Sequence, residues 1–282
     1  MQKLSDWDRE ALLSSPLLKP LHGVIERLAK DDFPTLEQLN VLLAARSAPI
    51  ETESGQLLRF VSQRHGMLPP EQQYEPLCYL TGGVQTREKN WHDFFNALIW
   101  MCYPSAKAAI NARHFNVLKH GAAVGNTGTS GRGGVRDMCT LLDESGVLVA
   151  SAEGELSGML QNFQWKELFW ERRTVLPKSM QFFIFGHGLC EKALHPYLGV
   201  TGQGLILPVD AQFFGWTEPD KCAYLDRRLA DYIANPAHCL STKELTPVPL
   251  LGYPGWFTGN EREAFFDNTD YFRPDRRNRR ES

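Results

Sequence analysis

The feature that most constrains the fold is an apolar run that directly follows two helix-start signals. Residues 90–103 read NWHDFFNALIWMCY, in which nearly every position from Phe94 to Met101 is apolar. Asn90 is a favoured N-cap, and Asp93 stands three residues later, where a carboxylate can reach the first free amides of a helix. A helix that is apolar on all sides is buried, and one this short cannot span a bilayer. The sequence therefore predicts a buried central helix.

A second helix is predicted immediately after the first. Pro104 suits the first position of a helix, where its missing N–H has no partner to lose. Apolar residues then recur on one side between Ala106 and Leu118. Lys107 and two later basic residues are expected on the opposite, solvent-facing side.

Several blocks of sequence resemble a known family. The blocks are TREKNWHDFFNALIW, YPSAKAAINARH, RDMCTLLDESGVLV, FGHGLCEK, and PLLGYPGWFTGN with FFDNTDYFRP. In these blocks the chain resembles a bacterial family of uncharacterised proteins, domain of unknown function 3025, over roughly residues 70–275. The resemblance implies a bacterial intracellular protein with a single family domain. It implies no established activity.

Composition and charge exclude several classes of protein. The chain has 282 residues, 43% of them apolar and 22% charged, which is ordinary for a globular enzyme or binding protein. No apolar stretch approaches the length of a membrane span, and the N-terminus lacks the pattern of a signal peptide. The six cysteines are scattered, without metal-like spacing. We expect a cytoplasmic protein that does not contact a membrane.

The net charge also bears on partners. With a formal net charge of −3, the folded body is not expected to bind nucleic acid strongly. The last ten residues, RPDRRNRRES, carry five arginines and are expected to form a disordered basic tail at 273–282. A small molecule or a protein remains open as the partner.

Elements elsewhere are predicted from periodicity and turn residues. Short helices are expected within residues 1–50, one of them opened by a capping box at Thr35 and Gln38. Residues 74–80 are expected to be a strand. The glycine-rich run 121–134 has too many glycines for regular structure and is expected to be a loop; a phosphate cradle is the alternative, but the lysine that a P-loop requires is absent. Residues 138–142 and 147–150 are expected to form a hairpin about the turn 143–146.

The remaining segments complete the prediction of the fold. Helices are expected near residues 158–173 and 219–233, and strands at 180–185 and 204–209. The predicted fold is α+β, with N-terminal and central helices packed on a small, mostly antiparallel sheet. We expect one globular domain over residues 1–272, composed of a helical N-terminal region (residues 1–50) and the family core (residues 70–272).

The start of the buried helix holds the first candidate site residues. His92 and Asp93 place an imidazole beside a carboxylate, a combination that can bind a metal ion or act in acid–base catalysis. The alternative is that Asp93 caps the helix while His92 bonds a nearby carbonyl. Neighbouring helix residues point in different directions, so the two side chains need not share one task.

Two further groups of residues could carry chemistry. Asp143 and Glu144 are carboxylates of the kind that holds a divalent cation, although Asp-Glu-Ser-Gly is also an ordinary turn sequence. His187 and Glu191 stand four residues apart and would share one side of a helix. The glycines on either side of His187 would allow close approach of a ligand or of another backbone segment. A plain hydrogen-bonded pair is the alternative for these two.

No motif names a reaction, because nucleophile-elbow, HExxH and dinucleotide fingerprints are all absent from the sequence. We expect a hydrolase whose catalytic residues are His92, Asp93, Asp143, Glu144, His187 and Glu191. If a divalent metal binds, the expected ligands are His92, His187 and Glu191, and zinc, manganese or iron would suit them better than calcium. The alternative is a non-enzymatic binding or regulatory protein that contacts a protein partner or RNA.

Overall fold

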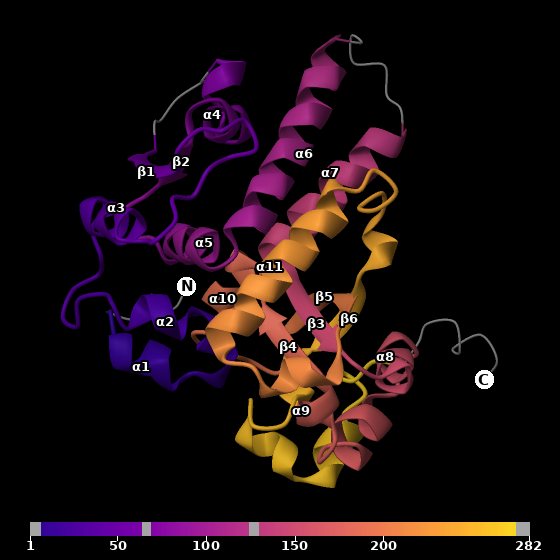
Figure 1. Ribbon diagram of the computed structural model, residues 1–282. Helices are drawn as coiled ribbons and strands as arrows, with labels where there is room; N and C mark the ends of the chain where they lie inside the picture. Colours follow the sequence, from indigo (N-terminus) through magenta and orange to yellow (C-terminus); the bar gives the residue numbers. More distant parts are fainter. Residues whose placement is uncertain (1–6, 64–68, 124–129, 275–282) are drawn as a thin grey trace.

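Helix α5 (Trp91–Cys102) lies at the centre of the structure, which is a computed structural model describing residues 7–63, 69–123 and 130–274 (Figure 1). The Asn90 side chain caps the helix by accepting a hydrogen bond from the amide of Asp93 at 3.0 Å. Every residue from Phe94 to Met101 is buried. The predicted buried helix is therefore confirmed.

Three long helices stand against one another above the sheet (Figure 1). Helix α6 (Pro104–Ala123) begins at the predicted proline, and it packs against α7 (Ser130–Ser145) and α11 (Glu218–Ala234). The N-terminal region consists of α1 (Arg9–Ser14), the 3-10 helix η1 (Pro16–Leu21), α2 (His22–Ile25) and α3 (Leu36–Ala44). The capping box predicted at Thr35 and Gln38 opens α3.

Two small sheets lie on different sides of α5 (Figure 1). Strands β1 (Arg59–Ser62) and β2 (Gly83–Thr86) form a parallel pair. The second sheet has the order β4-β3-β5-β6, with bounds Met180–Ile184, Gly146–Ser151, Thr201–Pro208 and Thr246–Pro249. Strand β3 pairs antiparallel with β4 and parallel with β5, and β5 pairs antiparallel with β6. The predicted α+β fold with a small, mostly antiparallel sheet is confirmed.

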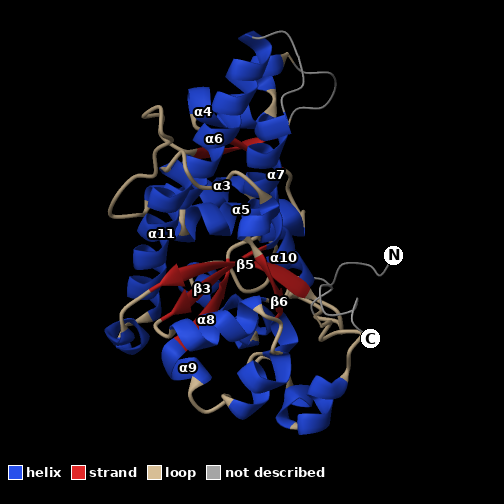
Figure 2. Ribbon diagram, turned by 90° about the vertical axis from the view of Figure 1, so that its right-hand side faces the viewer, coloured by secondary structure: helices blue, strands red, loops and turns tan. Residues whose placement is uncertain are grey.

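Shorter helices cover the four-stranded sheet. Figure 2 shows α5 and α10 (His187–Lys192) on one side of it, and α8 (Gly154–Gln161) and α9 (Leu176–Ser179) on the other. A π-helical turn, Glu167–Glu171, follows α8, and short 3-10 turns form the C-terminal segment. The buried apolar side chains of these layers form one connected core. Within the described residues, none of the helices combines the length and the apolar character needed to cross a membrane.

Three predictions about local structure fail. Residues 74–80 belong to helix α4 (Tyr74–Thr81), not to a strand. The hairpin at 138–150 is absent, because residues 138–145 complete helix α7 and only 146–151 form a strand. The glycine-rich run is helical at 121–123 and from residue 130 onward, whereas residues 124–129 lie outside the described ranges. Most of the predicted disordered tail, residues 275–282, also lies outside them.

Candidate functional site

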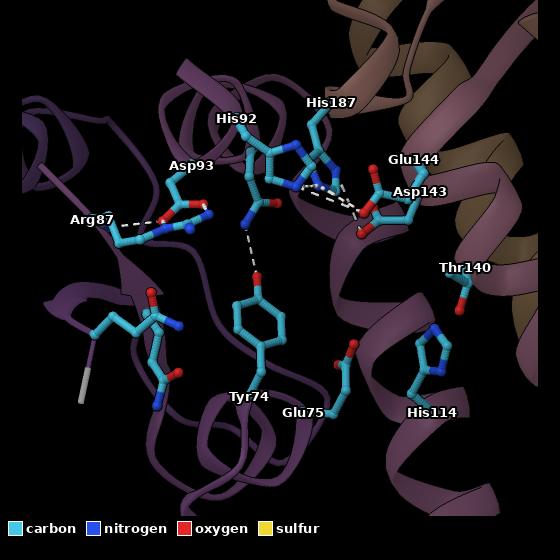
Figure 3. Close-up of a pocket in the computed structure, with 13 residues that line it drawn as sticks. Tyr74, Glu75, Arg87, His92, Asp93, His114, Thr140, Asp143, Glu144 and His187 are labelled. Atoms are coloured by element: carbon cyan, nitrogen blue, oxygen red, sulfur yellow. Dashed lines mark hydrogen bonds and ion pairs between the residues drawn. The ribbon is translucent and has the colours of Figure 1, made fainter. Parts of the chain in front are cut away.

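Three helix ends bring two histidines and a glutamate together (Figure 3). His92 stands at the start of α5, Glu144 at the end of α7, and His187 at the start of α10. The Nε2 atoms of the two imidazoles lie 3.0 Å apart. Glu144 Oε1 lies 3.6 Å from His92 Nε2 and 3.5 Å from His187 Nε2. One ligand atom from each residue thus falls within 4.8 Å of the others, close enough for a shared ion.

Glycines allow α10 to approach the end of α7 this closely. A Cβ atom on Gly186 would lie 2.5 Å from the backbone nitrogens of Ser145 and Gly146, which leaves no room for a side chain. A Cβ atom on Gly188 would lie 2.5 Å from Glu144 Oε2. The glycines predicted to permit a close approach therefore admit the Glu144 carboxylate and the backbone at the start of β3.

Each imidazole turns its other nitrogen toward a second carboxylate. His92 Nδ1 lies 3.3 Å from Glu191 Oε2, and His187 Nδ1 lies 3.6 Å from Asp143 Oδ2. A negative charge near Nδ1 favours the tautomer that carries its proton there, although His187 Nδ1 is buried without a hydrogen-bond partner. Glu191 therefore lies behind His92, on the side away from His187. The carboxylate near both Nε2 atoms is that of Glu144, not that of Glu191, which was the expected third metal ligand.

Asp143 is held by a buried lysine. The Nζ atom of Lys107, on α6, donates to Asp143 Oδ1 at 2.5 Å and to Asn96 Oδ1 at 2.9 Å. Asn96 Nδ2 in turn donates to the Tyr74 hydroxyl at 2.7 Å. Only 2% of Lys107 is exposed, so the prediction that it faces solvent is wrong. Lys107 can be buried because the Asp143 carboxylate neutralises its charge and Asn96 Oδ1 accepts a further hydrogen bond from it.

Burial and charge set the protonation of the cluster. Burial lowers the pKa of His187 to about 4, against an opposing effect of Asp143, so the ring is neutral at pH 7. Burial alone would raise the pKa of Asp143, but Lys107 and His187 hold it below its ordinary value. Burial raises the pKa of Glu144, although its side chain is 42% exposed. A neutral imidazole beside carboxylates is the state that binds metal ions.

The cluster forms one wall of a pocket of about 280 Å³. Figure 3 shows Tyr74 and Glu75 from α4 and His114 from α6 away from the two imidazoles. Burial raises the pKa of Glu75 to about 7 and lowers the pKa of His114 to about 4. Asn, Gln and Thr side chains complete the lining, at positions 63, 85, 96 and 140. The pocket can hold a small polar molecule.

Asp93 takes no part in the histidine cluster, although it lines the same pocket. Its carboxylate accepts hydrogen bonds from the backbone nitrogen of Arg87 at 2.7 Å and from the Arg87 Nε and Nη2 atoms at 2.8 and 2.9 Å. Burial would raise the pKa of Asp93, but the bonds from Arg87 bring it below its ordinary value. Asp93 therefore fixes the chain that enters α5, and the cap belongs to Asn90.

Sequence reasoning missed the residues of α4 and α6. Tyr74 and Glu75 fell in a segment predicted as a strand, and Lys107 in a face predicted as exposed. The sequence did contain a signal for the pocket residues of α6. Lys107, Asn111 and His114 recur at i, i+4 and i+7, which places three polar side chains in a row on a helix that is otherwise apolar on its buried side.

Comparison with known proteins gives a family and nothing more specific. No protein with a curated description and no solved structure matches the chain. A family model matches residues 58–276, which include every residue of the site described above. By this match the chain belongs to the DUF3025 family of proteins of unknown function.

Proposed function

We propose that this protein is a hydrolase that uses one divalent metal ion held by His92, His187 and Glu144. One observation carries the proposal: the two Nε2 atoms face each other at 3.0 Å, with a carboxylate oxygen 3.5–3.6 Å from both. Glu191 and Asp143 lie 3.3 and 3.6 Å from the two Nδ1 atoms, and these negative charges favour protons on those nitrogens. In that tautomer both Nε2 atoms present lone pairs to each other, and they repel unless a positive charge lies between them; a proton on one Nε2 would instead make the contact a hydrogen bond.

A divalent ion relieves this repulsion with little movement of the rings. Metal–imidazole bonds are about 2.0–2.1 Å long. Two such bonds at angles between about 90° and 109° separate the nitrogens by about 2.8–3.4 Å. The observed separation of 3.0 Å falls within this range. Glu144 is the most exposed of the three groups, so its carboxylate can close the remaining distance.

The donor set favours particular metals and leaves coordination positions free. Two imidazoles and one carboxylate suit zinc, manganese or iron and not calcium, which prefers oxygen ligands alone. Catalytic metal sites commonly have three protein ligands and an open position for water. A metal lowers the pKa of its bound water to about 7, so that hydroxide is available to attack a substrate. A metal with an open position held here would thus support hydrolysis.

Outer groups would keep the ligands in place. Glu191 holds the ring of His92 and Asp143 faces that of His187, and Lys107 neutralises Asp143 from behind. Such second partners of metal-bound histidines usually fix the tautomer and the orientation of the ring. The neutral state of His187, caused by its burial, means that no proton has to leave before metal binds near pH 7.

Metal analysis of protein purified without a histidine tag tests the proposal. We expect about one zinc, manganese or iron ion per chain, lost after His187→Ala and after Glu144→Gln. The second variant matters because Glu144 is partly exposed, so its replacement should leave the fold intact. His195→Ala, which changes an exposed histidine away from the pocket, is the matched control.

The possible outcomes separate the metal proposal from its rivals. Protein that neither contains metal nor takes up added zinc or manganese would refute it, and would favour a proton shared between the imidazoles. Bound iron with oxygen consumption would replace hydrolysis by oxidation, since two histidines and a carboxylate also serve iron oxygenases. Hydrolysis of ester, amide or phosphodiester probes that is abolished by Glu144→Gln would support the full proposal.

We also infer a cytoplasmic location in a bacterium, as the family resemblance implies. All six cysteines lie in the described ranges of the chain and are unpaired, and five of them are buried, which fits a reducing compartment. The alternative function, a regulatory protein that contacts a protein or RNA through its basic tail, depends on residues that lie mostly outside those ranges.

A further inference from the structure

Glu75 is half-buried, and its carboxylate lines the pocket without a cationic partner. Its Oε2 atom accepts a hydrogen bond from Asn111 Nδ2 at 2.6 Å. Within the described ranges, no lysine, arginine or histidine nitrogen comes within 4.0 Å of its carboxylate. Lys107 and Arg136 act on it only from a greater distance, and Asp143 adds an opposing negative charge. A buried carboxylate in such surroundings costs free energy when it is ionised.

The orientation of Asn111 limits the number of hydrogen-bond donors near the Glu75 carboxylate. Its Nδ2 atom also donates to the backbone carbonyl of Glu75 at 3.0 Å, which fixes the amide so that nitrogen faces Glu75. The Oδ1 atom of Asn111 is therefore left buried without a hydrogen-bond partner. Asn111 therefore cannot turn a second donor toward the Glu75 carboxylate, which keeps this one hydrogen bond from the amide.

The other carboxylates of the pocket each have nitrogen partners. Arg87 pairs with Asp93, and Lys107 pairs with Asp143. Glu144 faces the two imidazoles, where the proposed metal would neutralise it. Among the pocket carboxylates that the structure describes, Glu75 alone has no lysine, arginine or histidine nitrogen within 4.0 Å. It stands apart from the imidazoles in Figure 3.

We propose that Glu75 binds a positively charged group of the substrate, an ammonium or a guanidinium. The substrate is then a small cationic molecule with its charged end at Glu75 and its reacting bond at the His92 and His187 end of the pocket. A guanidinium or ammonium supplies the donors and the positive charge that Glu75 lacks. A pocket of about 280 Å³ limits the molecule to a few carbon atoms beyond that group. The position of the reacting bond rests on the proposed function, whereas the cation site at Glu75 does not.

The test compares two probes of similar shape and different charge. Methylguanidinium and methylurea are titrated into EDTA-treated protein at pH 8 and constant ionic strength, and binding is followed by calorimetry. We expect methylguanidinium to bind at least about tenfold more tightly than methylurea. Glu75→Gln, which keeps the shape and removes the charge, should abolish the preference. Glu53→Gln, at an exposed position, is the matched control and should retain it.

Each outcome decides the proposal. Equal binding of the two probes to the parent protein overturns it. A preference for methylguanidinium that survives in Glu75→Gln also overturns it and would place the cation at Glu144. Glu75→Asp keeps the charge and shortens its reach, so a weaker but persisting preference supports the proposal and also serves if Glu75→Gln does not fold. The probe titration uses metal-free protein, so a negative result there counts only against the cation site at Glu75. A negative metal analysis counts only against the proposed metal site.

Discussion

The pH dependence of stability gives a direct test of the environment of Glu75. Burial raises the pKa of this carboxyl from 4.5 to about 7. Between these values the folded state binds more protons than the unfolded state, so the free energy of unfolding falls as the pH rises through this window. The loss is complete above pH 7 and absent below pH 4.5. Glu75→Gln cannot ionise and should escape it.

The magnitude follows from the size of the pKa change. A rise from 4.5 to about 7 corresponds to about 3 kcal/mol between low and high pH. The carboxyl end of Glu75 opens onto the pocket, and water there reduces the effect, so we expect about 2 kcal/mol. Relative to the parent, Glu75→Gln should therefore gain about 2 kcal/mol in free energy of unfolding from pH 5 to pH 8.

Urea unfolding at pH 5 and pH 8, with EDTA present, measures this gain. The difference between variant and parent is needed because His187 and His114, whose pKa values are lowered to about 4, change stability in the opposite direction. Those two contributions are common to both proteins and cancel. Glu53→Gln should show no pH-dependent difference. A Glu75→Gln difference that is constant to within about 0.5 kcal/mol would refute the idea that the Glu75 carboxylate is shielded from water without a counter-charge.

Three further predictions concern the core and the histidine cluster. Trp100→Ala should lower the free energy of unfolding by about 3–5 kcal/mol in urea titrations, because only 1% of this side chain is exposed; a loss below about 1 kcal/mol would contradict the burial. Gly188→Ala should weaken zinc binding about tenfold in competition titrations by displacing Glu144, while Gly154→Ala, with open space around it, should not. As the pH falls from 6.5 to 4, metal-free His187→Asn should lose about 2–3 kcal/mol less free energy of unfolding than the metal-free parent, since burial lowers the pKa of His187 to about 4 and asparagine cannot be protonated.

Helix α5 and the fold class could be predicted because their signals are local and strong. A cap followed by eight apolar positions has few structural interpretations, and the helix begins and is buried where expected. Strands β4 and β5 were also close to prediction, since each is a short apolar run bounded by glycine or proline.

The failures arose where turn residues and local propensity competed with periodicity. The sequence Asp-Glu-Ser-Gly suggested a hairpin, but the apolar positions before it, at 135, 138, 139 and 142, recur at i, i+3, i+4 and i+7, as in a helix. In α4, two tyrosines favoured a strand. Pro76 is unsuitable within a central strand and acceptable in the first turn of a helix, so this residue favoured the helix over the strand.

The candidate site was predictable in its components and not in its arrangement. Glycines and caps beside His92, His187 and Glu144 marked element ends, and all three side chains meet. Which carboxylate lies between the rings depends on the packing of α7 against α10, and no local pattern encodes it. Glu75 could not be singled out, because its unusual environment comes from a helix 36 residues away along the chain.

The two imidazoles come from segments 95 residues apart, and this separation has a consequence for folding kinetics. Such a contact closes a long loop, so it is expected to form late, after α5, α7 and the sheet have assembled. An ion that needs both rings cannot bind the chain before that point. It would leave the rate of folding unchanged and slow the rate of unfolding, since it stabilises the native state and not the transition state. Occupancy of the site would then appear as a longer lifetime of the folded protein under denaturing stress.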